Sequence, residues 1–263
     1  MSNKILLESE DNFVTDIGAA FVGDRAVFKG KDLHKDLKYC SWMEVFLYGI
    51  TDRFFSAAEI KLINSLWSYT SYPDPRLWNN RAAALAGTAR STKAAGVSAS
   101  ISLCEAKLYG AGSCVKGIDF LQRAFASVEQ GVSLREFVKQ EIKRYRVIYG
   151  YGRPIKNATD ERVAPTLELM SELGIARGPY VELAFAIEKV LPRQKMNMAA
   201  LGGAIAADLG FTASQFHSFT IFCTVGGVLP CLDEALKKPE GSFFPLRSNS
   251  IAYEGVERRT WDK

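Results

Sequence analysis

The chain has 263 residues, of which 48% are hydrophobic and 24% charged, and this composition is ordinary for one or two folded domains with a substantial core. The net charge of +4 is mild, and no basic tract is interleaved with aromatic residues, so we expect no nucleic-acid partner. The five cysteines include no CxxC pair, so they give no signal for a zinc or redox site. They predict reduced thiols in a cytoplasmic protein.

No targeting or membrane segment is expected. The first sixteen residues are polar and acidic and lack the apolar core of a secretory signal. The longest apolar stretch, at about 219–232, is interrupted by Thr224, by two glycines and by Pro230. It is too short and too broken to predict a membrane span.

The N-terminal region predicts a short β-ribbon, and helices are predicted after it. Residues 15–18 and 26–30 combine glycines with β-branched and aromatic residues, as short strands do. An apolar helical face then runs from Trp42 to Leu47 and ends at Gly49. Ser56 to Glu59 has capping-box spacing and predicts the start of a second helix.

The remainder predicts a nearly all-α protein of about ten helices. Residues 81–112 are rich in Ala, Gly and Ser and predict two closely packed helices divided near Gly96. Further helices are predicted at about 115–130, from Ser133, at 160–173, from Pro179 to Val190, at 196–209, and from Thr212 through Leu229. The tail from Lys237 is irregular.

The most informative segment is Gly150-Tyr151-Gly152-Arg153-Pro154-Ile155, which is followed by Asp160-Glu161-Arg162. Glycines let the backbone approach a ligand closely, and an arginine fork matches a carboxylate or phosphate in two parallel hydrogen bonds. The segment resembles the Gly-Phe-Gly-His-Arg … Asp-Pro-Arg segment of the citrate synthase family. Arg153 stands at the position of the family's histidine.

Other segments resemble the citrate synthase and citryl-CoA lyase family in the same order. Three of them are 27–33 with 42–49, 80–92 and 209–211. Residues Lys107-Leu108-Tyr109-Gly110-Ala111-Gly112 stand where the family has Pro-Leu-His-Gly-Gly-Ala, and residues 197–203 stand where the family has Asn-Val-Asp. The resemblance spans most of the chain, with one apparent deletion of several helices between about Trp67 and Asn80.

The resemblance implies an all-α, citrate-synthase-like two-domain helical fold with a short N-terminal β-ribbon. Residues 1–114 and 192–263 would form the large domain and the C-terminal tail. Residues 115–191 would form a small helical domain inserted in it. Family members pair through large-domain helices, so the resemblance also implies a homodimer.

The family's catalytic residues are replaced in this chain. In the family, one histidine stabilises the enol oxygen of an acyl-CoA, an aspartate removes its α-proton, and a second histidine polarises a keto-acid carbonyl. The corresponding positions here are Tyr109, Ala199 and Arg153. Tyr109 can donate a hydrogen bond to an enolate oxygen and Arg153 can hold a carboxylate or oxyanion, but Ala199 cannot accept a proton. The nearest candidate bases in the sequence are Asp160, Glu161 and Glu105.

The resemblance implies further ligand-contacting residues. The predicted substrate-binding residues are Asn80, Gly110, Arg162, Asn197 and Arg247, and Gly150 and Gly152 are predicted to bind the cofactor. Arg162 is either a clamp for a substrate carboxylate or half of an ion pair with Asp160 at a helix start. His34 and His217 fall on no family motif and are expected to be structural.

These observations predict a citryl-CoA lyase-like enzyme that cleaves or forms a C–C bond next to an acyl-CoA thioester through a stabilised enolate. Coenzyme A would enter as the thioester, the other substrate would be a small carboxylic acid different from citrate, and no metal is predicted. One alternative is a non-catalytic binding or interaction protein with the same fold, because all three catalytic residue types are replaced. Another alternative is a hydrolase of a CoA-activated acid.

Overall fold

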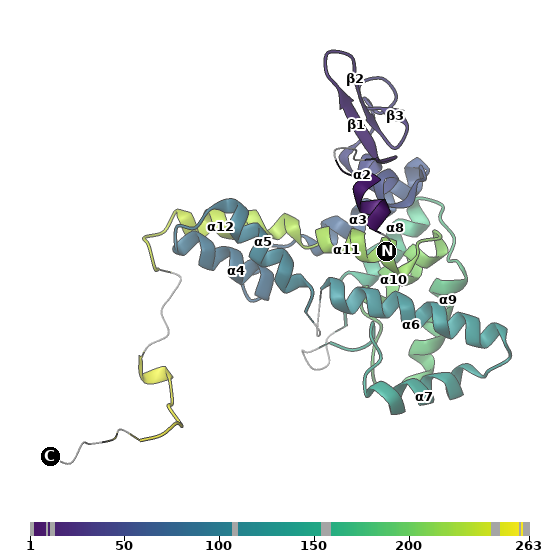
Figure 1. Ribbon diagram of the computed structural model, residues 1–263. Coiled ribbons are helices and arrows are strands. Elements are labelled where there is room, and N and C mark those ends of the chain that lie inside the picture. Colours follow the sequence, from purple (N-terminus) through teal and green to yellow (C-terminus); the bar gives the residue numbers. More distant parts are fainter. Residues whose placement is uncertain are drawn as a thin grey trace. The chain divides into compact units, whose positions relative to one another are not determined.

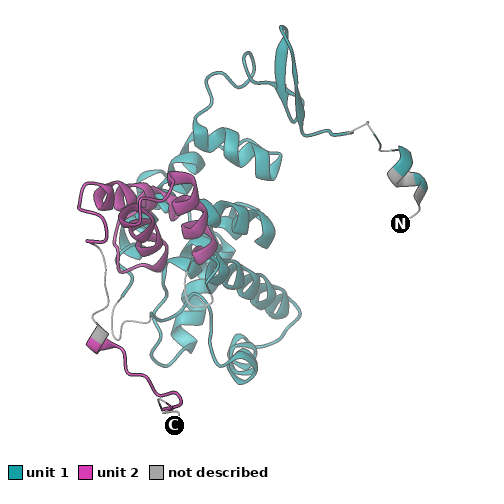
Figure 2. Cartoon of the chain, turned by 60° about the vertical axis from the view of Figure 1, so that its left-hand side comes forward, with its two compact units in different colours: residues 1–70, 105–223 teal, residues 71–104, 224–263 magenta. Residues whose placement is uncertain are grey.

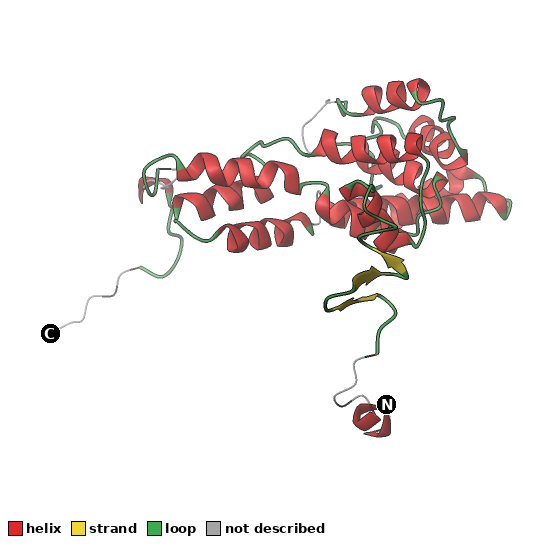
Figure 3. Cartoon of the chain, turned by 90° about the horizontal axis from the view of Figure 1, so that it is seen from above, coloured by secondary structure: helices red, strands yellow, loops and turns green. Residues whose placement is uncertain are grey.

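The computed structural model describes residues 3–8, 10, 14–106, 110–153, 159–242, 248–257 and 259. The described residues form twelve α-helices and one small sheet (Figure 1). The chain divides into two compact units (Figure 2): unit 1 consists of Met1–Thr70 and Glu105–Cys223, and unit 2 of Ser71–Cys104 and Thr224–Lys263. The predicted all-α class with a short N-terminal ribbon is confirmed (Figure 3).

Unit 1 begins with a short helix and an antiparallel ribbon. These elements are α1 (Asn3–Glu8), β1 (Gly18–Phe21), β2 (Arg25–Phe28) and β3 (Lys31–Asp32), and the strand order is β1-β2-β3. Lys29 and Gly30 join β2 to β3 with φ angles of 47° and 78°, as two-residue hairpin turns require. The first strand lies at 18–21 rather than at the predicted 15–18, because Gly18 pairs with Phe28 and this pairing sets the register.

The helices of unit 1 follow the ribbon. They are α2 (Trp42–Thr51), α3 (Ala57–Thr70), α6 (Ala111–Glu129), α7 (Leu134–Tyr145), α8 (Val163–Glu172), α9 (Pro179–Val190), α10 (Met198–Asp208) and α11 (Ala213–Phe222). The predicted capping box at Ser56 is confirmed, because its hydroxyl accepts from Glu59 N and the Glu59 carboxylate accepts from Ser56 N. Pro179 occupies the first turn of α9, where its missing N–H costs no hydrogen bond.

Helix α10 lies in the core of unit 1. It is apolar on every side, as expected for a helix surrounded by protein, and Leu201 is fully buried. It packs against α6 and α9, and α6 also packs against α7, α9 and α11. A Cβ placed on Gly203 would lie 3.4 Å from Ile118 of α6, so the two helices approach closely at that glycine. A Cβ on Gly117 of α6 would lie 3.2 Å from Ala199 O, so the first turn of α10 also lies against α6.

Unit 2 is a small helical cluster. It contains α4 (Trp78–Thr88), α5 (Lys93–Cys104), η1 (Val225–Gly227), α12 (Val228–Leu236) and η2 (Ser248–Ser250), and its core is built from alanines of α4 and apolar residues of α12. The predicted division of 81–112 near Gly96 is wrong. The break lies at 89–92, where Arg90 adopts a left-handed φ of 57° and the Thr92 hydroxyl accepts from Ala95 N. Gly96 lies inside α5, close to Leu232.

Two other predicted helix boundaries are also wrong. The helix that begins after Thr212 ends at Phe222, so Leu229 belongs to α12. Helix α8 begins at Val163 rather than at Asp160, because the Asp160 side chain is engaged in other hydrogen bonds.

The stretch Ala213–Leu236 is long and apolar enough to cross a membrane by length and composition alone. Its residues Phe216 and Phe219 are buried in unit 1 and Leu232 is buried in unit 2. Core helices pass the same test, so this stretch is weak evidence for a span.

The compact units do not follow the boundaries drawn from the family resemblance. Contacts group 105–190 with the N-terminal 70 residues, whereas the resemblance places a domain boundary at 114/115 and another at 191/192. A family domain is an evolutionary division and a compact unit is a contact-based one. The domain boundaries 1–114, 115–191 and 192–263 therefore stay a prediction.

Candidate functional site

The glycine turn that carries Arg153 is fastened to the start of α10. Asn197 caps α10, because its Oδ1 accepts from Ala199 N at 2.9 Å. Its Nδ2 donates to Gly152 O at 2.7 Å, and its backbone N–H donates to Gly150 O at 2.9 Å. One asparagine therefore connects two of the family-like motifs, which lie more than forty residues apart in the sequence.

Gly150 is required by the geometry of this turn. Its φ is 90°, a conformation that L-amino acids rarely adopt. A Cβ at this position would also lie 2.6 Å from the Cβ of Ala200, which is closer than two non-bonded carbon atoms approach in proteins. The turn therefore packs directly against the first turn of α10, and this packing fixes the backbone that leads into Arg153.

Asp160 forms the second connection to α10. Its carboxylate accepts Nε and Nη2 of Arg162 at 2.8 and 2.7 Å, and its Oδ2 also accepts from Met198 N at 2.9 Å. The Asp160 side chain is 1% exposed. Burial favours the protonated form of Asp160, but the hydrogen bonds and charge of Arg162 outweigh it, so the pKa of Asp160 is lowered. The ion pair with Asp160, one of the two roles predicted for Arg162, is present, and the role as a clamp for a substrate carboxylate stays a prediction.

Arg153 is held more loosely. Its Nη1 donates to Glu161 Oε2 at 2.6 Å and to Thr159 O at 3.0 Å. The side chain of Arg153 is 20% exposed, and that of Glu161 is 64% exposed. The hydrogen bond from Arg153 lowers the pKa of Glu161, which therefore stays ionised at neutral pH. Because this pair is open to water, another anion can compete with Glu161 for the guanidinium.

The start of α6 lies against the same centre. Gly110 is the N-cap residue of α6, and its carbonyl accepts from Ser113 Oγ at 2.9 Å. The next residue, Cys114, lies close enough to Arg162 for the arginine charge to affect its titration. Burial raises the pKa of Cys114 to about 11 in spite of that charge, so the thiol is protonated at neutral pH and is a poor nucleophile.

A histidine–carboxylate pair lies just before α6. His217 of α11 has its Nε2 2.7 Å from Oε1 of Glu105. A Cβ on Gly112, in the first turn of α6, would lie 2.9 Å from Glu105 O, so Glu105 adjoins that turn. Motif spacing gives no signal for the pair because 112 residues separate its members. Only the packing of α11 on α6 brings them together.

The structure brings together five of the predicted site residues within unit 1: Gly150, Gly152, Arg153, Arg162 and Asn197. Gly110 is in the same unit, at the start of α6. Asn80 belongs to unit 2, where it is 1% exposed and its Nδ2 donates to Tyr72 O and Asp74 O. These bonds orient the chain before α4. Tyr109 and Arg247 lie outside the described residues.

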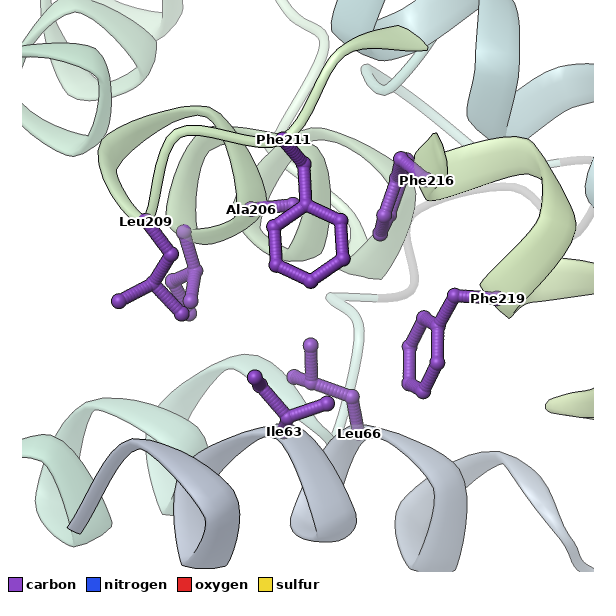
Figure 4. A pocket seen from close by; sticks show the side chains of 8 residues that line it. Ile63, Leu66, Ala206, Leu209, Phe211, Phe216 and Phe219 are labelled. Atoms are coloured by element: carbon purple, nitrogen blue, oxygen red, sulfur yellow. The ribbon is translucent and has the colours of Figure 1, made fainter. Parts of the chain in front are cut away.

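Two hollows occur away from these motifs. One is a void of about 10 Å³ in the core of unit 1, lined only by apolar side chains such as Phe211, Phe216 and Phe219 (Figure 4). It has too little room for a ligand and no polar group to hold water. The other is a surface hollow of about 360 Å³ lined by Ser41, Trp42, Met43, Ile60, Lys61 and Asn64. Neither is lined by a predicted site residue.

Within the described part of the chain, no group of three or more His, Cys, Asp or Glu side chains is arranged to hold a metal ion. The charged or titratable side chains described near the family-like motifs include Arg153, Arg162, Glu105, Asp160, Glu161 and His217.

Comparison with solved structures shows the fold. Citryl-CoA lyase from Hydrogenobacter thermophilus is 18% identical, with a TM-score of 0.83 over 95% of this chain and 98% of that one. ATP citrate lyase from Methanosaeta concilii, solved with (3S)-citryl-CoA, is 16% identical, with a TM-score of 0.74 over 98% of this chain and 45% of that one. Citrate synthase from Thermoplasma acidophilum, solved with carboxymethyl coenzyme A and oxaloacetate, is 19% identical, with a TM-score of 0.61 over 85% and 59%.

The chain thus spans nearly the whole citryl-CoA lyase but about half of the two longer proteins. A search of curated proteins gives no match. The family model described as "Citrate synthase, C-terminal domain" matches residues 17–234, which include the ribbon, the glycine turn, the Asn197 cap and α11. This match covers most of the sequence, and the chain therefore belongs to the citrate synthase family.

Proposed function

We propose that this protein is a citryl-CoA lyase-like enzyme that acts on an acyl-CoA thioester and cleaves or forms the C–C bond next to it through a stabilised enolate. Family membership supports a CoA-dependent reaction of this kind. Structural relatives have been solved with citryl-CoA, with citrate and coenzyme A, and with carboxymethyl coenzyme A and oxaloacetate. In this proposal coenzyme A enters as the thioester and a small carboxylic acid is the other substrate or product.

The observation that carries the proposal is the fastening of the Gly150–Arg153 turn to the start of α10 by Asn197. A cation on a rigid glycine turn can present its guanidinium to a carboxylate or oxyanion in a fixed orientation. The two glycines have φ angles of 90° and 83°, and they let the backbone of the turn lie close to the start of α10.

The two arginines have different roles in the proposal. Arg153 is paired with the exposed Glu161, and an exposed ion pair contributes only about 0–1 kcal/mol, so a ligand carboxylate can replace Glu161. Arg162 is paired with the buried Asp160, whose charge would be left without a partner if the arginine moved. We assign ligand binding to Arg153 and the support of α10 to Arg162. Tyr109 would stabilise the enolate oxygen.

The alternative is a non-catalytic protein of the same fold that binds a CoA compound or another subunit. It is favoured by Ala199, which cannot accept a proton at the position of the family's aspartate, and by the pairing of both arginines with carboxylates. A hydrolase of a CoA-activated acid is the remaining possibility from the sequence.

Calorimetric titration with CoA, acetyl-CoA and citryl-CoA, followed by assay for cleavage products, tests the proposal. We expect a thioester to bind the wild-type protein. It should bind Arg153→Ala at least about tenfold more weakly, because the variant lacks one charge-assisted hydrogen bond to the ligand. Arg76→Ala is the matched control, because Arg76 also forms an exposed ion pair with a neighbouring acid, Asp74. Equal binding by the two variants would contradict the role of Arg153. Binding without turnover would favour the non-catalytic alternative.

We also propose that the protein is a cytoplasmic homodimer, as the thiols and the family resemblance suggest. The expected mass in solution is twice the 29.1 kDa of the chain, or about 58 kDa by light scattering.

A further inference from the structure

His217 and Glu105 form a hydrogen-bonded dyad. His217 Nε2 and Glu105 Oε1 are 2.7 Å apart, and the two side chains are 33% and 45% exposed. When the neutral imidazole donates its Nε2–H to the carboxylate, the lone pair is on Nδ1. Among the described residues Nδ1 has no hydrogen-bond partner, so it is available to accept a proton from a ligand.

Structural stabilisation explains the pair poorly. Both side chains are partly exposed, and an ion pair of that kind contributes about 0–1 kcal/mol to folding. Helix α11 is already anchored to the core by Phe216 and Phe219, which are 3% and 2% exposed. Its capping box at Thr212 and Gln215 supplies the hydrogen bonds of its first turn. Fixing α11 does not require His217.

The dyad lies beside the candidate site. Glu105 O adjoins Gly112, which is in the first turn of α6 and is the last residue of the family-like segment 107–112. Helix α11 packs on α6, and the thiol of Cys223 at its end is close enough to Cys114 and Arg162 for their charges to affect its titration. Phe211 O, just before α11, accepts from Gln122 of α6, so the helix that carries His217 runs along α6 and ends near Cys114 at the start of α6.

The other acids near this centre are unsuited to act as a base. Asp160 and Glu161 are each held by an arginine, and both have lowered pKa values, so they accept protons poorly at neutral pH. Asp208 lies at the opposite end of α10 from Asn197, and its carboxylate accepts from Tyr180 N and Val181 N at the start of α9, although burial raises its pKa. Ala199 has no acceptor.

We propose that His217, oriented by Glu105, is the general base of the reaction and replaces the missing aspartate. This inference rests on the proposed function. In the cleavage direction, Nδ1 takes the hydroxyl proton of a 3-hydroxyacyl thioester. The C–C bond between the carbinol carbon and the α-carbon then breaks, and its electron pair passes to the thioester enolate. The imidazolium returns the proton to the α-carbon, giving a carbonyl compound and the shorter acyl-CoA. Glu105 is a positioning residue, because it acts through the imidazole.

The reverse use of the same base gives a direct test. In D₂O the enzyme should exchange the α-protons of acetyl-CoA for deuterium, and mass spectrometry measures the rate of this exchange. Calorimetry measures the binding of acetyl-CoA to the same protein. We expect His217→Ala to lose about 100-fold or more in exchange rate with little change in binding, as for removal of a general base. Added imidazole should restore part of the His217→Ala rate. Glu105→Asp should retain more exchange than Glu105→Gln.

His34→Asn is the matched control, because His34 is the only other histidine of the chain and is exposed in the turn that follows β3. Exchange by His34→Asn should equal that of wild type. Unchanged exchange in His217→Ala, or binding by wild type without exchange, would overturn the dyad but leave the binding site intact. Failure of wild type to bind acetyl-CoA or citryl-CoA would overturn the proposed function, and the dyad with it. Circular dichroism excludes unfolding as the cause of a loss.

Discussion

Asp160 binds Arg162 in a bidentate pair at 2.8 and 2.7 Å and uses one of the same oxygens to accept Met198 N at the start of α10. A single buried carboxylate thus joins α8, through the residue before its first turn, to the central helix of unit 1. The cost of burying the charge is offset by three donors on the two oxygens and by a fourth from Arg162 N. This arrangement supports the candidate site.

Asp160→Asn should therefore destabilise the protein by roughly 3 kcal/mol at pH 7, because Arg162 keeps its charge but loses the buried carboxylate that pairs with it. The pKa of Asp160 is lowered in the folded state, so its contribution is fully present above the unfolded value of about 3.9 and is lost as the pH falls through the folded pKa. Urea unfolding should show a difference between wild type and variant that shrinks below about pH 4. A difference that is constant from pH 7 to pH 3 would contradict this account.

Gly150→Ala should destabilise unit 1 by more than backbone strain alone. A left-handed φ costs an L-residue about 1–2 kcal/mol, and here the new Cβ would also lie 2.6 Å from the Cβ of Ala200. Gly131→Ala is the matched control, because Gly131 has a φ of 86° and nothing within 4 Å of its added Cβ. We expect a lower unfolding temperature for Gly150→Ala than for Gly131→Ala. Equal temperatures would mean that the contact with α10 relaxes freely.

Local sequence signals predicted the elements of this fold well. The capping boxes at Ser56 and Thr212 and the proline at 179 fix helix starts through hydrogen bonds within a few residues. The errors arose where a side chain or backbone had two possible uses. Aspartate is typical of helix starts, but the Asp160 side chain accepts from Met198 N at the start of α10. Glycine is typical of helix breaks, but Gly96 lies inside α5.

The site could be predicted only where motifs carried it. The glycine turn was predicted from its glycines and arginine, and Asn197 was predicted because 197–203 resembles the family's Asn-Val-Asp segment. The partners of the arginines and the His217–Glu105 pair depend on contacts between distant segments, which no periodicity reports. His217 was interpreted as structural because it lay on no motif, whereas its position beside α6 follows from the packing of α11.

Cys114 should be slow to react with alkylating reagents in the folded protein. Its burial raises its pKa to about 11, so at pH 8 about one thiol in a thousand is ionised, whereas a thiol of pKa 8.5 is about one-quarter ionised. Mass spectrometry after iodoacetamide treatment should find that the half-buried Cys114 is labelled much more slowly in the folded protein than after unfolding in urea. Rapid labelling of Cys114 in the folded state would show that the start of α6 opens to solvent.

Arg153→Ala and Arg162→Ala should separate ligand binding from stability. Arg153 is paired with the exposed Glu161, so its removal should cost less than about 1 kcal/mol of folding free energy but should weaken thioester binding. Removal of Arg162 leaves the buried Asp160 without its cation and should cost roughly 3 kcal/mol, which lowers the unfolding temperature by about 6–12 °C in a chain of this size. Calorimetry for binding and thermal unfolding for stability measure the two effects. If Arg162→Ala weakens binding while its unfolding temperature equals that of wild type, Arg162 is the substrate clamp and the assignment of roles is reversed.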